Sequence, residues 1–193
     1  MILRRASPLP ADEAVERAWT HADGWLREAL GGARPDSTRL AAALEEIYGE
    51  DRTFAVPILA ACTIGGAFAE DPDPWRVVRP LPFEVAALPQ GLFRFLGLPV
   101  VSYALPALIA IGQGIAHHRP SRNPVARLLR RALAPRTLRV LTGIQPENGG
   151  FLEATPLTSF VTLSLVAIGE VQHQVVSRGL SFLRASVRGD GSL

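Results

Sequence analysis

Apolar residues recur at three- and four-residue spacing along most of the chain, a pattern typical of amphipathic helices. The first such stretch runs from Ala11 to Leu30, after a loose leader over residues 1–10. Asp36 is suited to be the N-cap of a second helix, which is expected to stop at Gly49. A third stretch, from about Thr53 to Phe68, is apolar on all sides and is predicted to be an inner helix.

The next strongly patterned helix is predicted to begin at Pro124, with Asn123 as its N-cap. Its apolar residues, expected to face inward, are Val125, Leu128, Leu129 and Ala132. The other face carries a basic strip of Arg122, Arg127, Arg130 and Arg131, with Arg136 and Arg139 just beyond it. Two interpretations of this strip stay open: a solvated outer face, or a contact with anionic headgroups beside an apolar patch.

Two similar segments follow one another at the end of the chain. Leu141 and Leu183 are 42 residues apart, and the same spacing relates Gln145 to Val187, Gly149 to Gly191 and Phe151 to Leu193. Between these segments, Thr155-Pro156 opens an apolar helix that is expected to end at Gly169. A unit of helix, glycine-rich turn and helix with this period is typical of all-α repeat proteins.

The residues of these segments resemble the QW motif of the squalene–hopene and oxidosqualene cyclases. Arg178-Gly179-x-x-Phe182-Leu183, followed by Gly189-Asp190-Gly191-Ser192, carries most of the resemblance. The first segment keeps the glutamine of the motif as Gln145 and ends in Phe151, whereas the second has Val187 in place of glutamine and Leu193 in place of tryptophan.

A further segment resembles the same family. Leu81-Pro82-Phe83-Glu84, then Leu88-Pro89, then Ser102-Tyr103-Ala104 are similar to its Pro-Pro-Glu, Leu-Pro and Ser-Trp-Ala-Arg stretches, with Phe83, Tyr103 and Leu105 replacing proline, tryptophan and arginine. The resemblance extends over about residues 53–193 and corresponds to the part of a cyclase that precedes the catalytic acid.

The resemblance implies an all-α fold, an incomplete α/α toroid built as one helical repeat domain over residues 11–193. It implies that the glutamine caps a neighbouring helix end and that the aromatic ring stacks at the turn. The motif residues are then Gln145, Gly149, Phe151, Gly179, Phe182, Leu183 and Gly191. Candidate cavity residues are Phe54, Phe83, Tyr103 and Phe160, and candidate membrane contacts are Leu92, Phe93, Phe95, Leu96, Arg127, Arg130 and Arg131.

No catalyst is evident in the sequence. The family's protonating acid lies in an Asp-x-Asp-Asp stretch, which Asp71-Pro72-Asp73-Pro74 does not match, so a solvated turn is the better interpretation there. Glu84, Glu153 and Asp190 are lone acids in predicted turns. His117 and His118 are adjacent and point about 100° apart on a helix, so they do not form a metal site by themselves. No metal and no cofactor are therefore expected.

Charge and hydropathy narrow the classes of partner. The net charge of +2 is too small to favour nucleic acid as a partner, and all 20 basic residues are arginine, which we attribute mainly to coding bias.

Residues 95–116 contain no charge over 22 positions, which reaches the length of a membrane-spanning helix. Pro99 and Pro106 within this run favour a buried helix preceded by a surface loop, and insertion into one leaflet or spanning remain alternatives. The N-terminus shows no signal peptide, so we expect a cytoplasmic protein, with peripheral attachment to the inner membrane face as an option.

Three functional hypotheses follow from these patterns. The first is a part or split subunit of a squalene-type triterpene cyclase, an isomerase, that contributes apolar cavity wall and membrane contact and is inactive alone. The second is a non-catalytic helical module that binds isoprenoid or other lipid, and the third is a small integral membrane protein. The expected partners are a polyene lipid, a membrane surface, and a complementing cyclase half or a second copy of the chain.

Overall fold

The computed structural model describes residues 36–49, 52–68, 70–88 and 104–188, with helical residues at positions 17, 20, 21, 24 and 28. The described residues are helical or irregular, and none of them lies in a strand. The all-α class is therefore confirmed for this part of the chain. The isolated helical positions fall within the predicted first helix, whose other residues lie outside the described part. The chain divides into compact units of residues 1–78 and 79–193, where the sequence had predicted one domain from residue 11.

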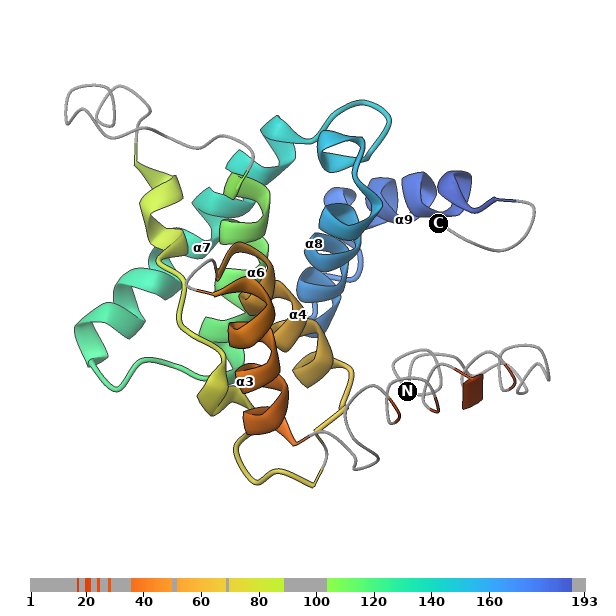
Figure 1. The fold of residues 1–193 in the computed structure, drawn as a ribbon. Coiled ribbons are helices and arrows are strands. Elements are labelled where there is room, and N and C mark those ends of the chain that lie inside the picture. The colour runs from red at the N-terminus through yellow and green to blue at the C-terminus, as the bar shows by residue number, and fades with distance from the viewer. Residues whose placement is uncertain are drawn as a thin grey trace. The chain divides into compact units, whose positions relative to one another are not determined.

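The first unit contains two helices and a short 3-10 turn. Helix α3 (Ser37–Tyr48) begins as predicted, because the Asp36 carboxylate accepts a hydrogen bond from the Arg39 N–H at 2.8 Å. Helix α4 (Arg52–Ile64) and η1 (Pro74–Val77) pack against α3 and against each other. Both helices are labelled in Figure 1. Buried apolar side chains of this unit are Leu44, Ala55, Val56, Leu59, Ala60, Phe68 and Val78.

The acidic turn after α4 is only partly solvated. Asp73 is exposed as predicted, but the side chain of Asp71 is only 6% exposed. Asp71 accepts hydrogen bonds from the hydroxyl of Ser37 and, at 3.0 Å, from the Asp73 N–H. Arg76 lies 3.9 Å from the same carboxylate. The expectation of a wholly solvated turn was therefore wrong at Asp71, since this carboxylate ties the turn to the first residue of α3.

These contacts predict an acid-sensitive first unit. The hydrogen bond from Ser37, followed by that from the Asp73 N–H, lowers the pKa of Asp71 below its ordinary value. The unfolded chain then binds more protons than the folded chain in acid, so the stabilisation is complete above about pH 5 and decreases as the pH falls below about 4. In urea titrations across this range, Asp71→Asn should remove part of the pH dependence. Asp73→Asn removes the same charge two residues away and should leave that dependence in place; an equal effect of both variants would contradict the assignment.

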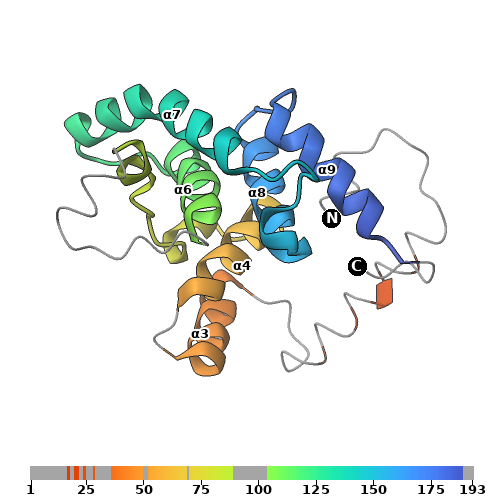
Figure 2. The same cartoon turned by 90° about the horizontal axis from the view of Figure 1, so that it is seen from above.

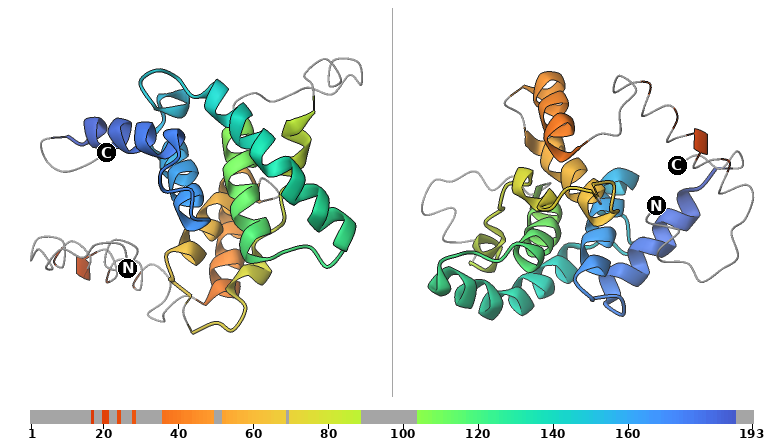
Figure 3. Two further views of the ribbon diagram at one scale, coloured as in Figure 1. Left: turned by 180° about the vertical axis from the view of Figure 1, so that it is seen from behind. Right: turned by 90° about the horizontal axis from the view of Figure 1, so that it is seen from below.

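The second unit is built from α-helices and two short 3-10 segments. Helix α6 packs most extensively against α8, α9 packs on α8, and α7 packs against α6 and η2. Figures 2 and 3 show α6 and α8 side by side, with α7 and α9 packed around them. The elements in chain order are η2 (Phe83–Ala87), α6 (Leu105–His118), α7 (Pro124–Ile144), η4 (Phe151–Glu153), α8 (Thr155–Ala167) and α9 (Gln174–Ser186).

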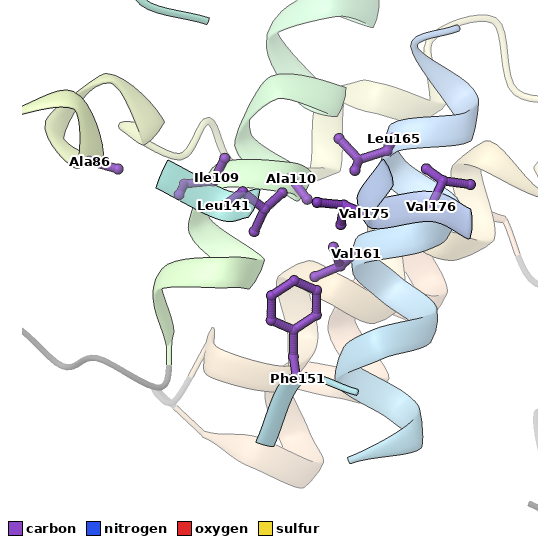
Figure 4. Close-up of a cluster of buried hydrophobic side chains, with 9 residues drawn as sticks. All are labelled: Ala86, Ile109, Ala110, Leu141, Phe151, Val161, Leu165, Val175 and Val176. Atoms are coloured by element: carbon purple, nitrogen blue, oxygen red, sulfur yellow. The ribbon is translucent and has the colours of Figure 1, made fainter. Parts of the chain in front are cut away.

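The core of this unit draws one or two side chains from each helix. Figure 4 shows the cluster, in which Phe151 points from the turn after α7 toward Val161 of α8. Its buried members are Ala86, Ile109, Ala110, Leu141, Phe151, Val161, Leu165, Val175 and Val176. Residues 109–115 of α6 are all buried, which confirms the predicted inner helix for the part of the uncharged run that is described. No helix of the described chain is both long enough and apolar enough to cross a membrane.

Helix α7 is rotated relative to the sequence prediction. Val125, Leu128 and Leu129 were expected to face inward, but they are exposed, Val125 to 72%, and so is Ala132. Thr137 and Leu141 are fully buried and determine which face of α7 meets the rest of the unit. That face, continued toward the N-terminus at helical spacing, carries Ala134 and Arg130, which are half-buried, instead of Val125, Leu128 and Leu129. The expected orientation was therefore wrong for the first half of α7.

Candidate functional site

The turn between α7 and α8 contains the best-matched residues of the first motif copy. Gln145 follows α7 with φ −73° and ψ 124°, and Val187 follows α9 with φ −66° and ψ 124°. In both cases the backbone N–H lies 3.4 Å from the carbonyl three residues earlier, that of Thr142 or of Arg184. Two helices thus end with the same backbone geometry at the 42-residue spacing read from the sequence.

The side chain of Gln145 is buried and connects the turn to another helix. Its Nε2 donates hydrogen bonds to the Gly149 carbonyl at 3.0 Å and to the Val175 carbonyl at 3.1 Å. Val175 is the second residue of α9, so the amide joins the turn to the first turn of that helix. The Gln145 Oε1 is buried and has no hydrogen-bonding partner among the described residues. Among the described residues, the Gln145 side chain therefore contacts α9 only as a hydrogen-bond donor.

Two glycines let the backbone of the turn approach α9 closely. Gly149 has φ +86°, a left-handed conformation that favours glycine, and a Cβ there would collide with the Arg178 carbonyl. A Cβ on Gly150 would collide with the ring of Phe182. The Asn148 Oδ1 accepts a hydrogen bond from the Gly150 N–H at 3.0 Å and stabilises this conformation.

Phe151 completes the turn and joins it to α8. Its ring is only 2% exposed, and its N–H donates to the Thr158 Oγ1 at 3.0 Å. The Thr158 hydroxyl in turn donates to the Ala154 carbonyl at 2.9 Å. Leu152 and Glu153 follow with φ of 54° and 55°, an unusual conformation for residues other than glycine. The sequence did not single out Thr158; its position in the first turn of α8, after a helix-starting Thr-Pro, was the available signal.

Three further motif residues, Gly179, Phe182 and Leu183, lie on α9. Gly179 is buried and faces Thr162 of α8, and Phe182 contacts Gly150. Leu183 is half-buried, and Gly191 lies outside the described residues. The structure thus brings the turn of the first motif copy against the helix of the second.

Two of the candidate cavity residues are described in the second unit and one in the first. Phe83 is buried in the second unit and Phe160 is half-buried on α8. Phe54 belongs to the first unit and is about half exposed. Tyr103 lies outside the described residues, and so do four candidate membrane contacts, Leu92, Phe93, Phe95 and Leu96.

The three candidate arginines of α7 share a cleft in the second unit. Its volume is about 340 Å³, and it lies among the C-terminal half of α6, the loop after α6, the first turns of α7 and the residues after α8. Arg127, Arg130 and Arg131 enter it from α7. The other lining residues are Phe83, Gln113, Ala116, His117, Pro120, Ser121, Ala134, Ile168 and Glu170.

Hydrogen bonds hold α7 against both neighbouring elements at this cleft. The Arg130 Nε donates to the Glu84 Oε1 at 3.2 Å, and both side chains are mostly buried. The Gln113 Nε2 of α6 donates to the Thr137 hydroxyl at 2.8 Å. Among the described residues, neither Arg127 nor Arg131 forms an ion pair. Glu84 was interpreted as a lone acid of a turn; in the structure it anchors Arg130.

Cys62 and His118 have pKa values that their surroundings shift. The described residues hold no cluster of three or more His, Cys, Asp or Glu side chains placed to bind a metal. Burial raises the pKa of the Cys62 thiol, which keeps it protonated and weakly nucleophilic at neutral pH. Burial, and then the charge of His117, lowers the pKa of His118. A comparison of the chain with known protein families, characterised proteins and solved structures found no match.

Proposed function

We propose that residues 79–193 form part of an α/α repeat array of the squalene-cyclase kind, in which they contribute apolar wall and not the protonating acid. The observation that carries the proposal is the buried Gln145 amide, which joins the turn after α7 to the first turn of α9. In the family that the motif resembles, the corresponding glutamine caps a neighbouring helix end. Here the amide reaches a helix end by donating to the Val175 carbonyl.

The arrangement of the helices supports the same proposal. Helices α7 and α9 end alike at a separation of 42 residues, and the helices that precede them in the chain, α6 and α8, pack against one another. A repeat array requires each unit to bury a face against the next, and the turn lying on α9 does this. The proposed substrate class is a polyene hydrocarbon, because an apolar cavity wall binds such a molecule through apolar contacts and presents no polar groups that would bind a polar ligand instead.

The acid that protonates the polyene would come from another segment or chain. Protonation of an alkene needs a carboxylic acid kept neutral by its surroundings, and the acids Glu84 and Asp71 are engaged otherwise. Glu84 pairs with Arg130, and Asp71 pairs with Ser37 and Arg76. A complementing cyclase half or a second copy of the chain is thus the proposed partner.

Complementation tests this proposal. The purified chain would be incubated with squalene alone, and together with the C-terminal half of a squalene–hopene cyclase that carries the Asp-x-Asp-Asp stretch. We expect cyclised product, detected by gas chromatography and mass spectrometry, in the mixture only. An unrelated helical protein of similar size in place of the chain is the control. Absence of both product and association between the two folded halves would reject the proposal.

A second candidate function is a non-catalytic module that binds isoprenoid or other lipid. The exposed apolar stripe of Val125, Leu128 and Leu129 on α7 favours it, because an apolar surface of this kind is typical of contact with an apolar partner. Retention of squalene by the chain without conversion, both alone and in the mixture, would select this candidate over the first.

A further inference from the structure

Most arginines of α7 are exposed, as expected of a basic strip, and three of them, Arg127, Arg130 and Arg131, also line a cleft. We propose that this cleft is a binding site for a phosphate group, carried by a phospholipid or by a soluble phosphate ester. The inference does not depend on the cyclase proposal, since the residues of the turn after α7 do not line the cleft. It rests on the placement of Arg127, Arg130 and Arg131 around one cavity of about 340 Å³.

Arg130 is already held in position for such a ligand. Its Nε is occupied by the Glu84 carboxylate at 3.2 Å, which fixes the guanidinium plane. Among the described residues, its two terminal nitrogens have no hydrogen-bonding partner. A guanidinium presents paired N–H groups that match two phosphate oxygens, so an arginine fixed at its Nε keeps donors available for an anion.

Arg127 and Arg131 are exposed, and their like charges repel one another weakly in the absence of an anion. They are four residues apart on α7, which puts two like charges on neighbouring turns of one face. Both line the cleft, and neither has an ion-pair partner in the described chain. A bound anion between them would offset this repulsion and give each guanidinium a partner.

The rest of the lining suits a phosphate with an organic part. Ser121 and His117 add hydroxyl and imidazole groups, while Phe83 and Ile168 supply apolar surface. The volume of about 340 Å³ exceeds that of a phosphate ion and falls within the range of small-molecule sites. Three guanidiniums face two carboxylates, those of Glu84 and Glu170, so the cleft keeps a net positive charge.

Two probes would test the site on the full-length chain: inorganic phosphate, and vesicles of phosphatidylcholine with or without phosphatidylglycerol. The cleft variant Arg127→Gln/Arg131→Gln removes two charges without breaking a described ion pair. The matched control Arg136→Gln/Arg139→Gln removes two exposed charges from the same helix outside the cleft. Circular dichroism would verify that both variants fold.

We expect saturable phosphate binding that the cleft variant weakens by about tenfold or more, and the control variant by less than about twofold. Anionic vesicles that compete with phosphate would identify a lipid headgroup able to occupy the cleft. Vesicle binding that depends on Arg127 and Arg131, without measurable binding of inorganic phosphate, would identify a lipid headgroup as the source of the phosphate group that the cleft binds. Equal losses in the two variants, or no saturable binding of either probe, would overturn the proposal.

Discussion

Replacement of Gly149 by alanine is expected to lower the free energy of unfolding by about 2–4 kcal/mol. The left-handed backbone at φ +86° costs a residue with a Cβ roughly 1–2 kcal/mol, and the new methyl group would also collide with the Arg178 backbone. Relief of the collision requires the turn to move away from α9, which strains the hydrogen bond between Gln145 and the Val175 carbonyl. Urea denaturation followed by circular dichroism measures the effect.

Gly143→Ala is the matched control for this substitution. Gly143 lies in the last turn of α7, and a Cβ there would meet no atom within 4 Å. Alanine at this helical position should raise the free energy of unfolding by about 0.5–1 kcal/mol. If Gly149→Ala left stability unchanged while Gly143→Ala behaved as expected, the turn would not be packed on α9 as described.

Replacement of Phe151 by alanine is expected to cost about 3–5 kcal/mol of the free energy of unfolding. The ring fills the core between the turn and α8, so its removal loses transfer free energy and leaves a cavity. A loss of this size approaches the total stability of many domains, and a partly unfolded product is within the expected range. Thermal and urea unfolding of the variant and the parent chain provide the measurement.

Substitution of the neighbouring residue, Leu152, is the control for any general effect of truncating a side chain in this turn. Leu152 is 60% exposed, so Leu152→Ala should change the free energy of unfolding by no more than about 0.5 kcal/mol. Comparable losses of stability at positions 151 and 152 would show that truncation of any side chain in this turn is destabilising. That result would contradict the assignment of the Phe151 ring to the core.

Both large effects concern the contact on which the proposed repeat array depends. If Gly149→Ala and Phe151→Ala destabilise the chain as expected, the turn holds α8 and α9 together, as an array of repeats requires. The complementation experiment then tests the cyclase function separately, because a stable array is compatible with either of the two proposed functions.

Several helix starts were predictable because their causes are local. Asp36 caps α3, and Asn123 caps α7 with Pro124 in its first turn. Thr155 begins α8 as expected. A cap residue acts on N–H groups two or three positions away, so the information lies within one turn of sequence. The 42-residue spacing also has a local cause, because it relates the residues at which α7 and α9 end.

The partners of the turn residues were not predictable in the same way. Gln145 and Gly149 were identified as residues of a turn, but their contacts with Val175 and Arg178 join segments about 30 residues apart. A single sequence does not show which positions so far apart along the chain are in contact. Only the packing of α9 against α8 brings them to the turn.

The orientation of α7 shows most clearly where the sequence stopped being sufficient. Its pattern determined that residues 124–144 form a helix with an apolar stripe and a basic stripe. The tertiary structure decided which stripe faces the unit. Burial of Thr137 and Leu141 in the second half, and pairing of Arg130 with Glu84 in the first, turn Arg130 toward the unit and leave Val125 and Leu128 exposed. The contacts along the whole length of a helix determine its rotation about its axis together, and hydrophobicity in one half does not.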